Sequence, residues 1–462
     1  MAEPLHTAIP RGQPAGPTCW TEPQLQQHGA AVRAVFLEEL NREPDPEGLL
    51  AYVWRMGCYH ETKEQIRASV QASPEYAALH PSVPPSPPVT QRGQLRIVTG
   101  GFADDTGPTL PVFCHAGDLF AAYTRTPEPA LAQLDVVAAA GYRGIRFWTV
   151  LGGDYWTSKG RDISADTTPD YWAHLRTFLE ALHARGLQNI ISQGDVGQIR
   201  DRQGFMCQLG ATVNAVGPEV AAIVDAGNEA WQTGEPDPVR LAEMGAWFRH
   251  VCPQPLLTLT SPPGETKAEL DAYSLAPADL FDVHGYRGGR WYDKVRHIFS
   301  IGYEIKPRLR LGIQGEPTGP GELVSVTDNK DELDDNTLAA LALMALMSRQ
   351  AWVYMSGHGV VWRGPLESQP GFYAVPQAVA WLPTAITSWP TLMHGGERWA
   401  ATRVFAATGE MRCDHALSAD GRFACLIYGP GHARDLHPVR PVTIDLDQSF
   451  GPHIRLVIGR VV

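Results

Sequence analysis

The sequence has little cysteine and no long apolar run. Its seven cysteines are scattered over 462 residues without a C-x-x-C pair or another metal-ligand spacing, which favours free, mostly buried thiols. One alternative stays open, in which Cys413 and Cys425 face each other across a hairpin. No segment reaches the length of a membrane-spanning helix, so we expect no membrane insertion. Residues 1–20 lack the apolar core of a signal peptide, and no secretory signal is predicted.

Positive charge is also scarce. The chain has 38 Lys and Arg against 50 Asp and Glu, a net charge of −12, and no local basic patch, which argues against nucleic acid as a partner. No glycine-rich phosphate loop and no His/Glu cluster with zinc spacing is present, so no cofactor and no metal is expected. With 44% hydrophobic and 19% charged residues, the composition is that of an ordinary globular protein with a sizeable core.

Shifts in composition divide the chain into five expected segments. A helical pattern follows the irregular start, with Val32, Val35, Phe36 and Leu40 spaced for one buried face. After about residue 392 the helical period gives way to strand-like alternation with tight turns, which predicts a small antiparallel β-sandwich. The expected organisation is an irregular segment (1–20), a small helical domain (21–80), a Pro-rich linker (81–93), a long α/β region (94–390) and a C-terminal β domain (391–462).

The long middle region alternates short apolar runs with helical patterns. Eight such runs over nearly 300 residues predict the α/β fold class and a (β/α)8 TIM barrel. A doubly wound open sheet is the rival, but it needs a glycine-rich turn after an early strand, and none is present. The eight candidate strands lie within residues 111–117, 141–148, 187–194, 221–227, 255–261, 279–285, 308–315 and 351–357.

Polar and aromatic residues follow the predicted strands. In such barrels the active site lies at the C-terminal ends of the strands. Two of the strand-end residues are glutamates, and cleavage of a glycosidic bond requires two carboxyl groups, one protonated and one ionised. The strand-end residues are Arg146 and Trp148, Gln193 and Asp195, Asn228 and Glu229, His284 and Tyr286, Glu316, and His358 leading into Trp362.

In this order these residues resemble a glycoside hydrolase of clan A, the (β/α)8 retaining clan with cellulase-like and mannanase-like families. The resemblance covers residues 94–390, and it extends to a small hairpin before the first strand. It implies that Glu229 is the general acid/base and Glu316 the nucleophile. The other implied roles are Asn228 on the sugar 2-hydroxyl, Arg146 and Tyr286 on Glu316, His284 lining the subsite and Trp362 as its hydrophobic floor.

Some assignments within this resemblance stay open. Trp362 lies several residues past the expected end of strand 8, so Trp352 is an alternative inward-facing ring. Gln193 and Asp195 replace the His or aromatic residue that relatives carry after strand 3, which leaves the sugar open. Further aromatic residues that could stack on sugars or simply pack are Trp148, Tyr155, Trp156, Trp231, Trp291 and Tyr292.

The helical segment resembles a bacterial module of unknown function with the pattern R-x-P-D-x-x-G-L, here starting at Arg42. Such modules are found on surface and virion proteins, which suggests attachment to a larger assembly and virion-associated or extracellular action. The expected function is therefore retaining cleavage of β-glycosidic bonds in a polysaccharide or oligosaccharide. The alternatives are a glycan-binding adhesion protein without catalysis, such as a phage tail component, and a transglycosylase that uses the same residues.

Overall fold

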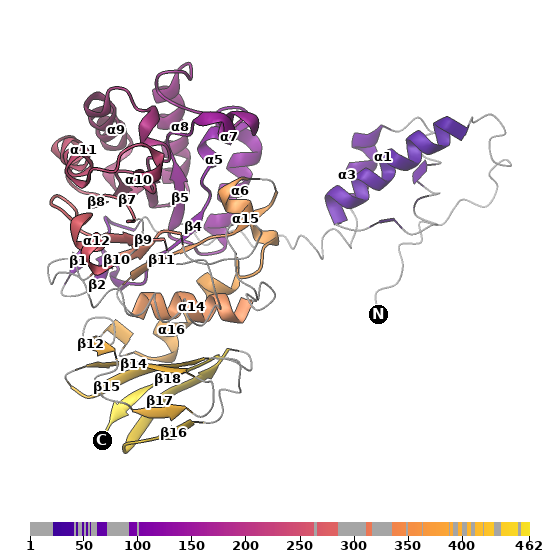
Figure 1. Cartoon of the computed structure of the whole chain (residues 1–462). Coiled ribbons are helices and arrows are strands. Elements are labelled where there is room, and N and C mark those ends of the chain that lie inside the picture. Colours follow the sequence, from indigo (N-terminus) through magenta and orange to yellow (C-terminus); the bar gives the residue numbers. More distant parts are fainter. Residues whose placement is uncertain are drawn as a thin grey trace. The chain divides into compact units, whose positions relative to one another are not determined.

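The chain forms two compact units in the computed structural model, Met1–Pro84 and Pro85–Val462 (Figure 1). Among the described residues, no helix combines the length and the apolar character that crossing a bilayer requires. The residues that the structure describes are 22–40, 43–44, 49, 52–53, 56, 62–71, 92–98, 101–262, 266–284, 311–316, 335–347, 350–362, 364–387, 389–390, 396–399, 404–407, 412–418, 420–428, 436–450 and 454–462.

The first unit is built on helices α1 (Glu22–Leu40) and α3 (Lys63–Gln71). Val32, Val35 and Phe36 are buried in its core, as their spacing predicted, together with Ile66 and Val70 from α3. The side chain of Leu40 and most of the R-x-P-D-x-x-G-L pattern lie outside the described residues. The proposed attachment role of this unit therefore stays a prediction.

The second unit contains an eight-stranded parallel barrel, and each predicted apolar run overlaps one of its strands. The strands follow the order β8-β7-β6-β5-β4-β11-β10-β9. The backbone N–H groups of Asp279 and Leu280 donate to the Leu257 carbonyl at 2.9 and 3.1 Å, which joins the two end strands. The strands are β4 (Val112–His115), β5 (Gly144–Trp148), β6 (Asn189–Ser192), β7 (Ala221–Asp225), β8 (Leu256–Thr258), β9 (Phe281–Val283), β10 (Gly312–Gln314) and β11 (Gln350–Tyr354).

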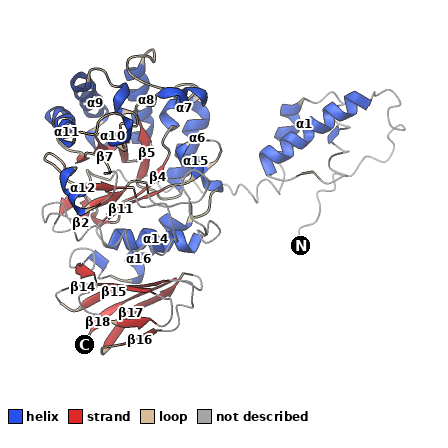
Figure 2. Ribbon diagram, in the orientation of Figure 1, coloured by secondary structure: helices blue, strands red, loops and turns tan. Residues whose placement is uncertain are grey.

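Helices cover the outside of this barrel (Figure 2). Phe113 and Ile313 belong to the apolar cluster inside the ring, whereas Cys114 and Trp352 pack outward against the helices. This alternation is the period-two pattern of a strand. The helices are α5 (Leu119–Tyr123), α6 (Pro127–Ala139), α7 (Gly153–Ser158), α8 (Tyr171–Ala184), α9 (Arg202–Val216), α10 (Ala230–Thr233), α11 (Pro238–Val251), α12 (Lys267–Ala272), α14 (Asp335–Met347), α15 (Gly357–Val360) and α16 (Ala374–Ala385), with the short turns η1 (Val196–Gln198), η2 (Pro218–Val220) and η5 (Leu366–Ser368).

A small antiparallel sheet closes the N-terminal end of the barrel, as the resemblance implied. It consists of β1 (Arg96–Val98), β2 (Gly101–Asp104) and β3 (Gly107–Thr109). Leu95 and Phe102 join the apolar cluster inside the ring. The apolar interior of the ring is therefore covered by this sheet at its N-terminal end.

The chain ends in antiparallel sheets, as predicted. The larger sheet has the order β12-β14-β15-β18-β17, and β13 pairs with β16. One face of the larger sheet packs with Phe405 from β13, and the other, with Leu426 and Leu456, joins the core formed by the barrel helices. The strands are β12 (Gly396–Trp399), β13 (Phe405–Ala407), β14 (Arg412–Ser418), β15 (Arg422–Tyr428), β16 (Leu436–Pro438), β17 (Val442–Ser449) and β18 (Ile454–Val461).

Three of the described cysteines are free thiols, namely Cys114, Cys207 and Cys252. In the β14–β15 hairpin, Cys425 lies opposite His415, and Cys413 lies opposite Ile427. The register therefore does not place the two hairpin cysteines across from each other.

Candidate active site

Arg146 is the centre of a polar cluster at the C-terminal ends of the strands. It points inward from β5 and is fully buried. One guanidinium nitrogen donates to Glu316 Oε1 at 2.9 Å, and another donates to Asn228 Oδ1 at 2.6 Å. Strands β5, β7 and β10 are thus joined by one side chain. Of the residues predicted from the sequence, Arg146, Asn228, Glu229, His284 and Glu316 form one contacting group.

Glu229 has an unusual backbone conformation. Its φ of 43° and ψ of 48° lie in the left-handed region, which is costly for a residue other than glycine. The turn is held by a hydrogen bond from Ala230 N to Thr260 Oγ1 at 3.0 Å, and the Gln232 amide donates to Glu229 Oε2. The carboxyl group is thereby turned toward the barrel while remaining 20% exposed. Strain of this kind persists where the surrounding structure enforces it, often at functional sites.

His284 lies between the two glutamates. Its Nδ1 is 2.9 Å from Glu229 Oε1 and 3.7 Å from Glu316 Oε2, and its Nε2 is 3.4 Å from Asp282 Oδ2. Burial alone would lower the pKa of His284, but the negative charges of Glu316 and Asp282 raise it to about 10. The ring is therefore protonated on both nitrogens and positively charged at neutral pH, next to both carboxyl groups.

The two glutamates are close together. One carboxylate oxygen of Glu229, one of Glu316 and one ring nitrogen of His284 all lie within 4.8 Å of one another. Within the described part of the chain, this is the group of carboxylate and imidazole atoms close enough to hold a cation. A cation bound here would have to displace the proton that His284 carries, because a metal binds the neutral imidazole.

Two buried aspartates beneath this group were not predicted from the sequence. Asp225 ends β7, accepts a hydrogen bond from Ser192 Oγ at 2.6 Å and lies 3.6 Å from Arg146. Burial and the charge of Asp282 raise the pKa of Asp225 to about 7, against the charge of Arg146. The signal for Asp282 was its spacing of two from His284, which puts both on the inner face of β9.

Glycine makes room for one of these aspartates. A Cβ atom on Gly315 would lie 2.6 Å from Asp282 Oδ1. The residue before Glu316 therefore has no side chain because the Asp282 carboxyl group occupies that space. This close approach places the strand end that carries Glu316 directly against the strand that carries His284.

His115 is a further buried residue that was missed. It ends β4, and its Nδ1 is 3.4 Å from an Arg146 guanidinium nitrogen. Its ring packs edge-on against Trp148 at 5.0 Å between centroids, and Trp148 packs edge-on against Trp156 at 5.4 Å. Trp148 is only 4% exposed. Its ring is therefore a packing partner of His115 and Trp156 and presents little surface to solvent.

Gln193 and Asp195, which follow β6, bind the backbone of neighbouring loops. The Gln193 carbonyl accepts the N–H of Asn228 at 2.8 Å, which fixes the turn that carries the Asn-Glu pair. Asp195 Oδ2 accepts the N–H of Gly152 at 2.8 Å and so holds the loop that follows β5. Both residues connect loops within the protein.

Of the last two predicted site residues, the structure describes Trp362 but not Tyr286. Tyr286 lies outside the described residues. Trp362 follows α15, is partly buried, and its backbone N–H donates to Asp118 Oδ1 at 2.8 Å. Trp352, the alternative, is 1% exposed and packs outside the ring with the helices. Of the two tryptophans, Trp362 is the one located beyond the strand end.

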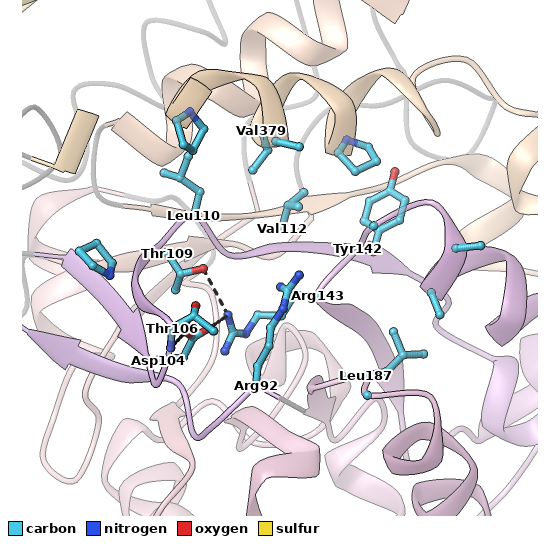
Figure 3. Close-up of a pocket in the computed structure, with 18 of the residues that line it drawn as sticks. Arg92, Asp104, Thr106, Thr109, Leu110, Val112, Tyr142, Arg143, Leu187 and Val379 are labelled. Atoms are coloured by element: carbon cyan, nitrogen blue, oxygen red, sulfur yellow. Dashed lines mark hydrogen bonds and ion pairs between the residues drawn. The ribbon is translucent and has the colours of Figure 1, made fainter. Parts of the chain in front are cut away.

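A cavity of about 590 Å³ lies at the other end of the barrel (Figure 3). Its lining includes Val112, which begins β4, and Leu187, which precedes β6. Arg143 and Asp104 meet there in a buried ion pair of 2.9 Å. None of the predicted site residues lines this cavity, and its ion pair joins the closing sheet to the barrel.

Comparisons with known proteins concern the whole fold. No model of a known protein family matches the chain. No curated protein matches it either. A solved glycoside hydrolase aligns with 81% of this chain and 98% of its own, at a TM-score of 0.52 and 14% identity.

Two further solved structures align less closely. A family 5 glycoside hydrolase from Prevotella bryantii B14, PbGH5A, covers 54% of this chain and 86% of its own, at a TM-score of 0.39 and 11% identity. The exo-β-1,4-mannosidase Op5Man5 from Opitutaceae bacterium strain TAV5 covers 62% of each chain, at a TM-score of 0.40 and 13% identity. At such identities a likeness concerns the fold alone, and the chain shares a (β/α)8 barrel with the first of these glycoside hydrolases.

Proposed function

We propose that this protein is a glycoside hydrolase that cleaves β-glycosidic bonds by retaining double displacement. The observation that carries the proposal is the pair of carboxyl groups at the ends of β7 and β10. Oxygens of Glu229 and Glu316 lie within 4.8 Å of each other. Retaining enzymes have carboxyl groups about 5–5.5 Å apart, and inverting enzymes about 6.5–9.5 Å. This separation supports the retaining arrangement over the inverting one, in which a water must fit between the carboxyl group and the sugar.

The surroundings of Glu316 fit a nucleophile. Its carboxylate is 5% exposed and pairs with Arg146, which is buried completely. An adjacent guanidinium favours the ionised form of a carboxyl group. Glu316 would therefore approach the anomeric carbon as an anion, with its Oε1 bound by Arg146.

The surroundings of Glu229 fit a general acid/base. Its carboxyl group is more exposed than that of Glu316 and shares a hydrogen bond with His284 Nδ1. The proton in that hydrogen bond is carried by His284, whose pKa is raised, and Glu229 would relay it to the oxygen of a leaving sugar. In the first step Glu229 donates this proton while Glu316 attacks, forming a glycosyl-enzyme ester. In the second step Glu229 takes a proton from water, which attacks the same carbon and releases Glu316.

Asn228 and Trp362 would bind the sugar. The Asn228 carboxamide oxygen accepts from Arg146, which leaves its amide N–H groups for the 2-hydroxyl beside the cleaved bond. The indole ring of Trp362 would form the apolar floor. The substrate class that the clan resemblance implies is a β-linked polysaccharide or oligosaccharide, and nothing in this group of contacts requires a cofactor.

The first experiment measures turnover and stereochemistry. The wild-type protein is incubated with a panel of aryl β-glycosides and plant and bacterial polysaccharides, and the anomer released first is identified by NMR. We expect the β-anomer. Release of the α-anomer would contradict double displacement.

The second experiment removes the nucleophile. Glu316→Gln is expected to lower kcat by about 10⁴-fold or more, because the amide cannot form the ester intermediate. Glu235→Gln is the matched control, since Glu235 is also a buried glutamate, but its carboxylate pairs with Arg202 and with none of the predicted site residues that the structure describes. Near-normal turnover by Glu316→Gln would disprove the assignment. If the wild-type protein binds a glycan without cleaving it, the adhesion alternative is favoured.

A further inference from the structure

Loops that follow three different strands meet at one buried carboxylate. Asp118 lies just after β4 and is fully buried. Its Oδ1 accepts the backbone N–H of Trp362 at 2.8 Å, and its Oδ2 accepts Nε of Arg161 at 2.8 Å. Arg161 in turn donates to the Trp362 carbonyl at 3.3 Å. Both backbone polar groups of Trp362 are therefore bound by this Asp–Arg pair.

The backbone around this pair is closely packed. The Gly117 N–H donates to the Gly359 carbonyl at 2.7 Å, and a Cβ atom on Gly359 would lie 2.2 Å from the His115 carbonyl oxygen. The loop that carries Arg161 is closed by a bridge between Leu151 and Ile163. Helix α15 thus lies directly on the end of β4, and the backbone there has little room to move.

The Asp–Arg pair is a costly way to join loops. Burial raises the pKa of the Asp118 carboxyl group, although the Trp362 N–H and Arg161 act in the opposite direction. A buried ion pair adds little net stability compared with apolar residues of similar size, but it fixes one geometry because each partner needs the other. The contribution of the Asp118–Arg161 pair therefore depends on the group that it holds in place.

We propose that Asp118 is a positioning residue that, with Arg161, fixes the backbone of Trp362 so that the indole ring meets the sugar in one orientation. The inference rests on the proposed function, in which Trp362 is the floor of the subsite. It adds two residues to the binding machinery, neither of which touches the sugar. They act only through Trp362.

A double-mutant cycle tests this dependence. Asp118→Asn keeps an acceptor for the Trp362 N–H but loses the charge that binds Arg161. We expect it to lower kcat/KM about tenfold, mainly through KM, because a displaced binding surface weakens positioning of the substrate. In a Trp362→Ala background, the same change should lower kcat/KM less than about twofold, since there is no ring left to position.

The chain offers a closely matched control. Asp104 is also a buried aspartate whose Oδ1 accepts a backbone N–H at 2.8 Å and whose Oδ2 binds an arginine at 2.9 Å. It lies at the closed end of the barrel, away from the predicted site residues. Asp104→Asn should lower the melting temperature comparably and leave kcat/KM unchanged. Equal losses of kcat/KM for the two variants, or an undiminished Asp118→Asn effect without the Trp362 ring, would overturn the proposal.

A second measurement does not depend on activity. Asp118→Ala removes the acceptor of the Trp362 N–H, so hydrogen–deuterium exchange in a peptide spanning residues 357–366 should accelerate at least about tenfold, whereas Asp104→Ala should leave that peptide unchanged. Unchanged exchange in Asp118→Ala overturns the positioning role. If exchange accelerates but the wild-type protein cleaves no glycoside, the proposed function fails while the fixing of Trp362 stands.

Discussion

The proton on His284 links the site to the stability of the protein. The pKa of His284 is raised from 6.5 to about 10 by Glu316 and Asp282, against the effect of burial. Between these two pH values the folded protein binds a proton that the unfolded chain releases. The free energy of unfolding therefore falls as the pH rises from about 6.5 to about 10, and the stabilising contribution is fully present below that window.

Replacing His284 should weaken the dependence of the unfolding free energy on pH. We expect His284→Gln to lose most of the decrease in unfolding free energy between pH 6.5 and 10, measured by urea denaturation at several pH values. His183→Gln serves as the control, because His183 pairs with Glu219 on the outside of the barrel. A profile that stays as steep as that of the wild-type protein would mean that His284 is neutral in the folded state.

The acid/base role of Glu229 predicts a dependence on the leaving group. Glu229→Ala should lose most activity on glycosides with poor leaving groups and much less on activated aryl glycosides, because the latter need little protonation. The measurement is kcat/KM for a series of aryl glycosides of graded phenol pKa. If log(kcat/KM) depended on the pKa of the leaving phenol with the same slope as in the wild-type enzyme, the acid/base assignment would be wrong.

The sequence predicts the residues that follow the strands better than most of those within them. Asn228, Glu229, His284 and Glu316 were identified because charged or amide groups after an apolar strand are conspicuous, and Arg146 because it is a charge inside the apolar run of β5. Asp225 and Asp282 lie within the strands, and only their contacts with Arg146 and His284 reveal them. The left-handed backbone of Glu229 has no signature in the sequence, because it follows from hydrogen bonds to residues elsewhere in the chain.

At the scale of elements, the barrel was predictable because the sequence shows both the short apolar runs of buried strands and the helical spacing between them. Parallel strands buried on both faces appear as short apolar runs, and the helices between them show their own spacing. The contacts between loops were not predictable, since they join distant residues such as Asp118 and Trp362. Where a loop lies depends on tertiary hydrogen bonds more than on its own composition.

Helix α15 provides a test at this scale. In Gly359→Ala the new methyl group would lie 2.2 Å from the His115 carbonyl oxygen, so the helix must move away from β4. We expect a loss of about 1–3 kcal/mol in unfolding free energy and a lower kcat/KM, because Trp362 follows this helix. Gly364→Ala is the control on the same segment, where the nearest atom would be 3.5 Å away. Equal tolerance of both changes would show that α15 can shift without consequence.

At the scale of the whole molecule, the two compact units should separate cleanly. The described core of the first unit consists of its own residues, such as Val35 and Ile66. A protein that begins at Pro85 should keep the melting temperature of the barrel and its kcat/KM on small aryl glycosides. Differential scanning calorimetry and kinetics on the truncated chain check this. A lost or broadened barrel transition would show that the helical unit contributes to folding of the rest.

The C-terminal sheet is a different case, because its inner face belongs to the core of the barrel helices. Leu426 and Leu456 lie in the same apolar cluster as Leu341 of α14 and Val379 of α16. This shared layer limits how the gene can recombine. A crossover near residue 391 would combine the barrel helices with a sheet whose apolar face did not evolve to pack against them, so the barrel and the C-terminal sheet must be inherited together. At the boundary before Pro85, by contrast, whole units can be exchanged.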